Sequence, residues 1–232
     1  MIIKRSEAIL GAIASVVTTV GCSLVRQRDS KRKKLLRIYV LGDSLALGLG
    51  AERPEDGFIF RAAMPLREAY SLALCDIAVS GATVADVYRL QVPRLRGISF
   101  DIAILCMGAN DVKSFAAPGD FASSYDAVLA SIEIAKTRRV ICCNIPNVSR
   151  SPRLSEEDSL AAQSLTREYN SSIRSLAKAY RAAFVDYSSM SAATESFSND
   201  GFHPSSAGYA KMADVLQPIL AETVRVIFKE SR

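Results

Sequence analysis

The stretch that decides the fold lies at residues 37–45 and reads Arg-Ile-Tyr-Val-Leu-Gly-Asp-Ser-Leu. The apolar run Arg37–Leu41 predicts a buried β-strand, and Gly42-Asp43-Ser44 predicts the turn that ends it. In an open parallel α/β sheet, ligands bind at the carboxyl ends of the strands. The polar residues of this turn are therefore the first place to look for a functional site.

Beyond this stretch, short apolar runs alternate with longer segments of helical period, which is the pattern of a parallel sheet covered by helices. We expect strands at Arg37–Leu41, Leu72–Ala78, Asp101–Cys106, Val140–Asn144 and Ala183–Asp186. We expect helices at Phe58–Tyr70, Val84–Leu90, Phe121–Lys136, Glu156–Tyr180 and Ser205–Phe228. Five strands joined by right-handed crossovers give a three-layer, doubly wound α/β domain.

The residues before this domain form a segment of different composition. Lys4 and Arg5 precede an uncharged apolar run over residues 9–25, and a basic cluster follows at residues 31–34. The pattern predicts a membrane-directed leader with a basic linker over residues 1–35, either a retained signal anchor or a cleaved signal peptide. The folded domain would then span residues 36–232. The basic residues after the run favour a cytoplasmic domain, whereas cleavage would give an exported one.

The charge distribution argues against nucleic acid as a partner. Residues 1–37 hold nine of the 29 basic and two of the 24 acidic residues, which leaves 20 basic and 22 acidic residues in the domain. A nucleic-acid-binding domain needs a basic face. The five cysteines have no zinc-site spacing, and His203 is the only histidine, so we expect neither a metal nor another cofactor.

Polar residues follow the expected strands in a combination that suits acyl transfer. Ser44 follows the first strand, Gly81 the second and Asn110 the third, while Asp200 and His203 follow the last. A serine nucleophile needs a base, and an acid must orient that base. The Ser44 and Gly81 N–H groups and the Asn110 amide are candidate oxyanion donors. We assign Asp43 and Asp111, which stand beside these residues, to structural hydrogen bonds.

Four sequence blocks resemble those of the SGNH (GDSL) hydrolase family, in the family's order: Val40–Leu45, Val79–Thr83, Met107–Asp111 and Asp200–Pro204. The resemblance implies a flavodoxin-like sheet of order 2-1-3-4-5 and metal-free hydrolysis of esters or thioesters. It implies Ser44 as nucleophile and oxyanion donor, Gly81 and Asn110 as the other donors, and Asp200 and His203 as the remaining triad members. The second and fourth blocks resemble the bacterial, lysophospholipase-like branch in particular.

The sequence thus predicts a serine esterase or lipase that acts on small-molecule or lipid esters, with lysophospholipids as candidate substrates and the membrane as a partner if the leader is retained. Two alternatives stay open: an acyltransferase that uses the same triad, and a silent domain that binds acyl chains or glycans. An α/β-hydrolase is disfavoured, because Ala46 stands where its motif needs a second glycine. We expect the loops Val112–Asp120 and Ile145–Leu154 to set the substrate.

Overall fold

The computed structural model describes residues 33–135, 137–188, 190 and 196–229. The predicted leader lies outside the described residues except for residues 33–35, and Lys34 and Leu35 belong to the first strand instead. Within them, no helix has both the length and the apolar character that crossing a membrane requires.

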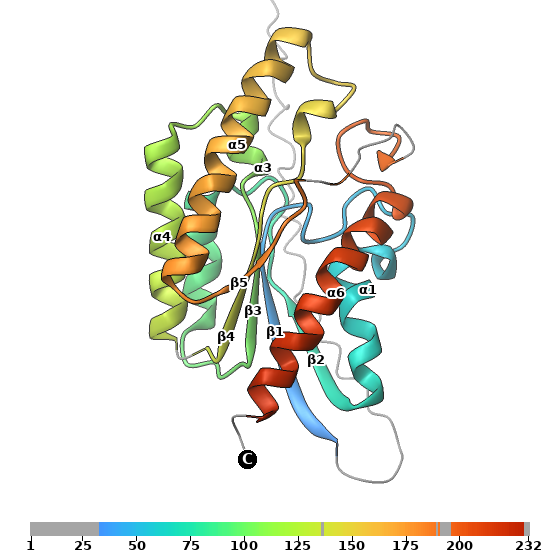
Figure 1. The fold of residues 1–232 in the computed structure, drawn as a ribbon, viewed down its shortest axis with the longest axis vertical. Helices are drawn as coiled ribbons and strands as arrows, with labels where there is room; N and C mark the ends of the chain where they lie inside the picture. The colour runs from blue at the N-terminus through green and yellow to red at the C-terminus, as the bar shows by residue number, and fades with distance from the viewer. Residues whose placement is uncertain (1–32, 136, 189, 191–195, 230–232) are drawn as a thin grey trace, which may run out of the picture.

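A five-stranded parallel sheet forms the centre of the domain (Figure 1). Its order is β2-β1-β3-β4-β5, which confirms the predicted order. The strands are β1 (Lys34–Gly42), β2 (Tyr70–Asp76), β3 (Ile102–Cys106), β4 (Arg139–Cys143) and β5 (Ala183–Val185). Because all five run in the same direction, their carboxyl ends meet at one edge, which is the upper edge in Figure 1.

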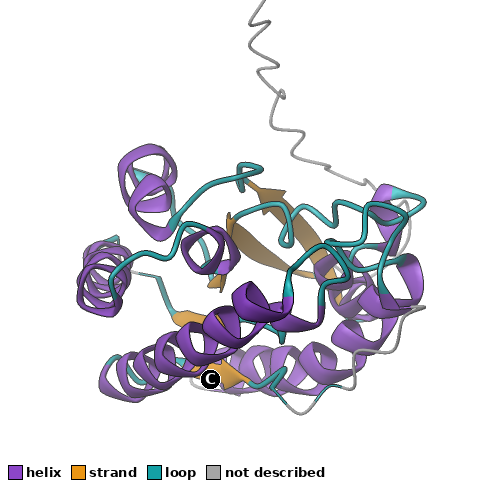
Figure 2. Ribbon diagram, turned by 90° about the horizontal axis from the view of Figure 1, so that it is seen from above, coloured by secondary structure: helices purple, strands orange, loops and turns teal. Residues whose placement is uncertain are grey.

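Helices cover both faces of this sheet and complete the predicted three layers (Figures 1 and 2). One face is covered by α1 (Phe58–Ala63) and α6 (Ser206–Lys229). The other is covered by α2 (Val84–Asp86), α3 (Ala109–Lys113), α4 (Pro118–Ile134) and α5 (Glu156–Ala179). Shorter helical turns lie at Pro54–Asp56, Met64–Glu68, Val87–Gln91, Val92–Leu95 and Val148–Arg150.

The side chains of β1 alternate between the two layers of the core. Leu36, Ile38 and Val40 pack into the cluster beneath α1 and α6, and Leu41 packs into the cluster beneath α4 and α5. Successive strand residues point to opposite faces of a sheet, so a strand covered on both sides is apolar at almost every position. This is why the first strand has a continuous apolar sequence.

Two predicted helices are shorter than expected, and prolines account for both differences. The predicted helix Phe58–Tyr70 stops being α-helical at Ala63 and continues as a 3₁₀ turn that contains Pro65, so β2 begins at Tyr70. The predicted helix Val84–Leu90 is α-helical only over Val84–Asp86, then becomes a π-helix and a 3₁₀ turn that contains Pro93. Proline lacks the N–H that an α-helix needs and clashes with the preceding turn.

Candidate active site

The turn after β1 is held in place by close packing at Gly42. A Cβ atom at this position would lie 1.8 Å from the Cys106 carbonyl oxygen, so only glycine fits. The side chain of the fully buried Gln91 binds both main-chain groups of Gly42. The Gly42 N–H donates to Gln91 Oε1 at 2.9 Å, and Gln91 Nε2 donates to the Gly42 carbonyl at 2.7 Å. These contacts fix the point from which Ser44 projects.

The structure brings Ser44, His203 and Asp200 into one hydrogen-bonded chain. Ser44 Oγ lies 2.9 Å from His203 Nε2, and His203 Nδ1 lies 2.6 Å from Asp200 Oδ2. Ser44 is buried at the end of β1, while Asp200 and His203 lie in the loop that precedes α6. Residues 159 positions apart in the sequence therefore meet at the carboxyl edge of the sheet.

The environment of Asp200 favours its ionised form. Partial burial opposes ionisation, but hydrogen bonds from the His203 ring, the Phe202 and His203 N–H groups and the Ser198 hydroxyl outweigh it. Together they hold the pKa of Asp200 well below its usual range. A carboxylate that is ionised and fixed by the backbone can orient the imidazole ring and stabilise its positive charge. Ser198 was not predicted, because a serine in a loop carries no signal of its own.

The predicted oxyanion donors lie on neighbouring loops. Asn110, in the first turn of α3, donates its side-chain amide to the Ala82 carbonyl at 3.1 Å and lies 3.5 Å from Asp43 Oδ2. Asn110 thus links the residue after Gly81 to the residue before Ser44. In the described part of the chain, neither the Ser44 N–H nor the Gly81 N–H donates to a protein acceptor. Gly81 has a positive φ of 80°, a conformation that favours glycine.

Two buried carboxyl groups, Asp43 and Asp111, accept hydrogen bonds from the main chain of these loops, as we expected. Asp43 accepts a hydrogen bond from the Leu45 N–H at 2.9 Å, and Asp111 accepts one from the Val84 N–H at 3.1 Å. Burial raises the pKa of Asp43 to about 7, with the charge of nearby Asp111 adding to the effect. Burial likewise raises the pKa of Asp111 to about 6. Neither group contacts the hydroxyl of Ser44 or the ring of His203 through a hydrogen bond in the described structure.

The domain cysteines lie in the strands rather than at this site. Cys75, Cys106, Cys142 and Cys143 are all buried, and burial raises the pKa of the Cys142 and Cys143 thiols to about 12. A thiol acts as a nucleophile in its ionised form. These groups therefore behave as small apolar side chains. No cluster of three or more potential metal ligands occurs among the residues that the structure describes.

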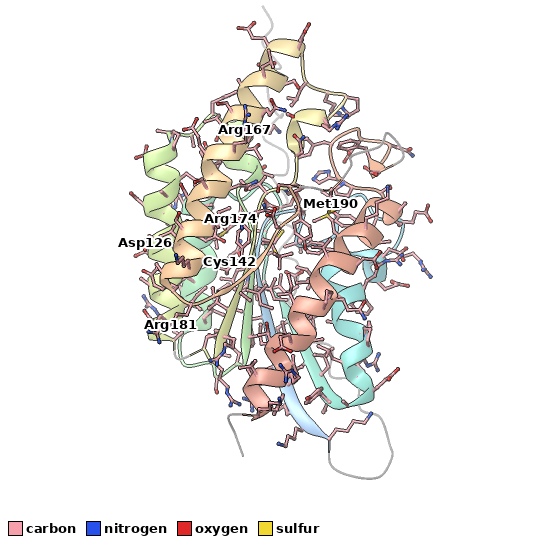
Figure 3. The ribbon with its side chains drawn as sticks, in the orientation of Figure 1. Asp126, Cys142, Arg167, Arg174, Arg181 and Met190 are labelled. Carbon is pink, nitrogen blue, oxygen red and sulfur yellow. The ribbon has the colours of Figure 1, made fainter. Side chains whose placement is uncertain are left out.

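An apolar cavity of about 80 Å³ opens beside Ser44 and His203. Its walls include Leu45 from the turn after β1, Pro146 from the loop after β4, and Met212 from α6. Met190, which Figure 3 shows beside the upper part of α6, and Phe197 complete the apolar lining. Pro146 belongs to a loop that was predicted to set the substrate, whereas Met190 and Phe197 were not predicted.

Comparison with known proteins connects this geometry to a family. A model of the GDSL-like lipase/acylhydrolase family matches residues 40–211, which is most of the chain. Comparison with curated protein sequences yields no match.

Solved structures share the fold at low sequence identity. A GDSL-like lipase from Parabacteroides merdae has a TM-score of 0.68 at 18% identity, with 82% of this chain and 97% of that chain covered. TesA has a TM-score of 0.67 at 17% identity, with 81% and 99% covered. A catalytic mutant of Axe2, an acetylxylan esterase from Geobacillus stearothermophilus, has a TM-score of 0.64 at 17% identity, with 81% and 94% covered.

The family match spans all four motif blocks. The chain therefore belongs to the GDSL-like lipase/acylhydrolase family and is a carboxylic ester hydrolase.

Proposed function

We propose that this hydrolase cleaves acyl esters, or thioesters, through a Ser44–His203–Asp200 triad and an acyl-enzyme intermediate. The observation that carries the proposal is the continuous chain of hydrogen bonds from Ser44 Oγ through the His203 ring to Asp200. A serine hydroxyl becomes nucleophilic when a base within hydrogen-bond distance takes its proton. His203, at 2.9 Å, is the only histidine of the sequence.

In the first half-reaction, Ser44 Oγ attacks the ester carbonyl carbon while His203 Nε2 takes the hydroxyl proton. The negative charge that develops on the carbonyl oxygen accepts hydrogen bonds from the Ser44 and Gly81 N–H groups and the Asn110 amide. Asp200 stabilises the imidazolium through Nδ1. The carbon–oxygen bond of the leaving alcohol then breaks, and that oxygen takes the proton from His203.

In the second half-reaction, water attacks the carbonyl carbon of the acyl-enzyme and gives a proton to His203. The bond to Ser44 Oγ breaks, the carboxylic acid is released, and the proton passes from His203 back to Ser44. The Asn110 amide donates to the Ala82 carbonyl at 3.1 Å and to Asp43 Oδ2 at 3.5 Å, so the longer of these two bonds gives way when the amide donates to the oxyanion.

The substrate class that we propose is a lysophospholipid or a related acyl ester with a phosphate in its alcohol part. Two exposed cationic side chains lie beside the loop that contains Asp200 and His203. The Lys113 ammonium lies 6.0 Å from the centre of the Phe202 ring, and the Arg153 side chain passes beside Gly201. An apolar cavity beside the nucleophile suits an acyl chain, and the two cations beside the loop of Asp200 and His203 suit a phosphate.

The test compares initial rates of the full-length chain on p-nitrophenyl esters from acetate to palmitate with those of Ser44→Ala and His203→Ala. Each variant should lose at least about 10⁴-fold in kcat, and the double variant should be no worse than either single one, because the residues act as a unit. Ser171→Ala, which changes an exposed serine on α5, should leave the rates unchanged. Ester hydrolysis that survives in Ser44→Ala would contradict the assignment of the nucleophile.

A second assay, which measures released fatty acid, tests the proposed head group. Lysophosphatidylcholine should be hydrolysed faster than a monoacylglycerol with the same acyl chain, and the double variant Lys113→Gln/Arg153→Gln should lose this preference. Equal rates on both lipids in the wild type would overturn phosphate recognition and leave the esterase in place. A preference for acetyl esters over both lipids would favour an acetyl esterase, the activity named for Axe2.

A further inference from the structure

The cavity beside Ser44 has a larger neighbour on the other side of one aromatic ring. A second cavity, of about 180 Å³, lies between α3 and α5 and is lined by Val112, Phe115, Leu154 and Ala162. The two cavities share two lining residues, Ala109 and Phe202. Ala109 has only a methyl side chain, so the ring of Phe202 makes up most of the wall between them.

The main chain of Phe202 is fixed independently of its ring. Its N–H donates to Asp200 Oδ1 at 2.8 Å, and the preceding Gly201 has a positive φ of 67°. The ring itself packs edge-on against the His203 imidazole, with centroids 5.1 Å apart. Because the main-chain hydrogen bond does not involve the side chain, a smaller side chain at this position can remove the wall while the loop that carries Asp200 and His203 keeps its anchor.

Both cavities offer the surroundings that an acyl chain needs. The first is lined by Leu45, Met190 and Met212, among other apolar residues. The second is apolar at Val112, Leu154 and Ala162, and it is polar only where Lys113 and Asp158 contribute to its lining. A linear acyl chain that left the first cavity toward Phe202 would therefore meet the apolar side chains of the second.

We propose that Phe202 determines the acyl-chain specificity of the enzyme by closing the first cavity, which receives the acyl group, from the second. The inference rests on the proposed acyl-enzyme at Ser44. In the wild type, only the part of the acyl chain nearest the ester is buried, in the first cavity, so further methylenes add little to kcat/KM. When the ring is absent, the two cavities join, and the distal methylenes of a longer acyl chain are buried against Val112, Leu154 and Ala162.

The experiment measures kcat/KM on p-nitrophenyl butyrate and octanoate for the wild type, Phe202→Ala, Ala162→Leu and the double variant. The quantity of interest is the octanoate-to-butyrate ratio, which does not depend on the fraction of active protein. Phe202→Ala should raise the ratio at least about tenfold, which is the gain expected when two further methylenes are buried. Ala162→Leu fills the second cavity and should cancel that gain in the double variant.

A matched control distinguishes the joining of the two cavities from a simple enlargement of the first. Phe197 lines the first cavity and not the second, so Phe197→Ala enlarges the acyl site without removing the shared wall. Adding Ala162→Leu to Phe197→Ala should leave the ratio of Phe197→Ala unchanged. A ratio in Phe202→Ala within twofold of the wild type, or a gain that Ala162→Leu does not cancel, would overturn the inference while the esterase stands. Wild-type rates no higher than those of Ser44→Ala would overturn the proposed function and this inference with it.

Discussion

Gly50 is the residue on which the position of His203 depends most directly. The loop after β1 passes so close to the triad loop that a Cβ atom at Gly50 would lie 2.7 Å from His203 Cβ and 2.8 Å from the Pro204 carbonyl oxygen. Its φ of 95° is also in the region that favours glycine. A side chain at position 50 would therefore displace the loop that contains His203.

We predict that Gly50→Ala lowers kcat at least about tenfold and lowers the melting temperature. The added methyl group must displace His203, and the positive φ alone costs about 1–2 kcal/mol for a residue with a Cβ atom. Gly119→Ala is the control, because a Cβ atom there meets no heavy atom within 4 Å and no positive φ is involved. Wild-type kcat and melting temperature in Gly50→Ala would show that the two loops are not tightly coupled.

At this scale, the sequence carries strong signals for some residues of the site and none for others. Ser44, Asp200 and His203 can be predicted because they follow expected strands and because one histidine leaves no other base of that type. Gln91 binds Gly42 from 49 positions away, and Phe202 acts through the place of its ring between two cavities. Such roles depend on three-dimensional packing, which no local pattern records.

Among the elements, β2 carries an ionisable group in an apolar setting. Asp76 ends this strand, and its Oδ1 accepts a hydrogen bond from the Ala78 N–H at 2.9 Å. Burial raises the pKa of Asp76 to about 6. The folded state therefore binds the proton more tightly than the unfolded state, and this group lowers stability progressively as the pH rises from about 4 to about 6.

We predict that Asp76→Asn raises the free energy of unfolding at pH 8 by about 3 kcal/mol and changes it little at pH 4. The amide keeps an acceptor for the Ala78 N–H but carries no charge to bury. Denaturant unfolding at the two pH values measures the difference. A variant whose stability differs from the wild type by the same amount at both pH values would contradict the role of ionisation.

The elements themselves could be predicted where periodicity is strong and poorly where proline or length intervenes. The predicted helices near α4, α5 and α6 agree with the structure to within three residues at each end. The five residues of α3 were not predicted as a helix, since a single turn of helix has too few positions to show a 3.6-residue period. The 3₁₀ and π segments around Pro65 and Pro93 were missed because propensity does not distinguish these helix types.

For the whole molecule, the alternation of strands and helices predicts the three layers, and the family resemblance supplies the strand order that the structure confirms. The site then follows from topology, because a parallel sheet brings the residues after its strands to one edge (Figure 1). The division of that edge into two cavities could not be predicted, since cavities depend on side-chain packing. The leader over residues 1–35 and the side of the membrane on which the domain lies stay predictions from the sequence.

The central claim is that Ser44 is the nucleophile and that His203 activates it. The most direct measurement treats the full-length chain with an alkyl fluorophosphonate and locates the modified residue by peptide mass spectrometry. We expect one phosphonyl group per chain, on the peptide that contains Ser44, with labelling lost in Ser44→Ala and slowed at least about 100-fold in His203→Ala. Labelling of another residue, or equal labelling of the wild type and Ser44→Ala, would contradict it.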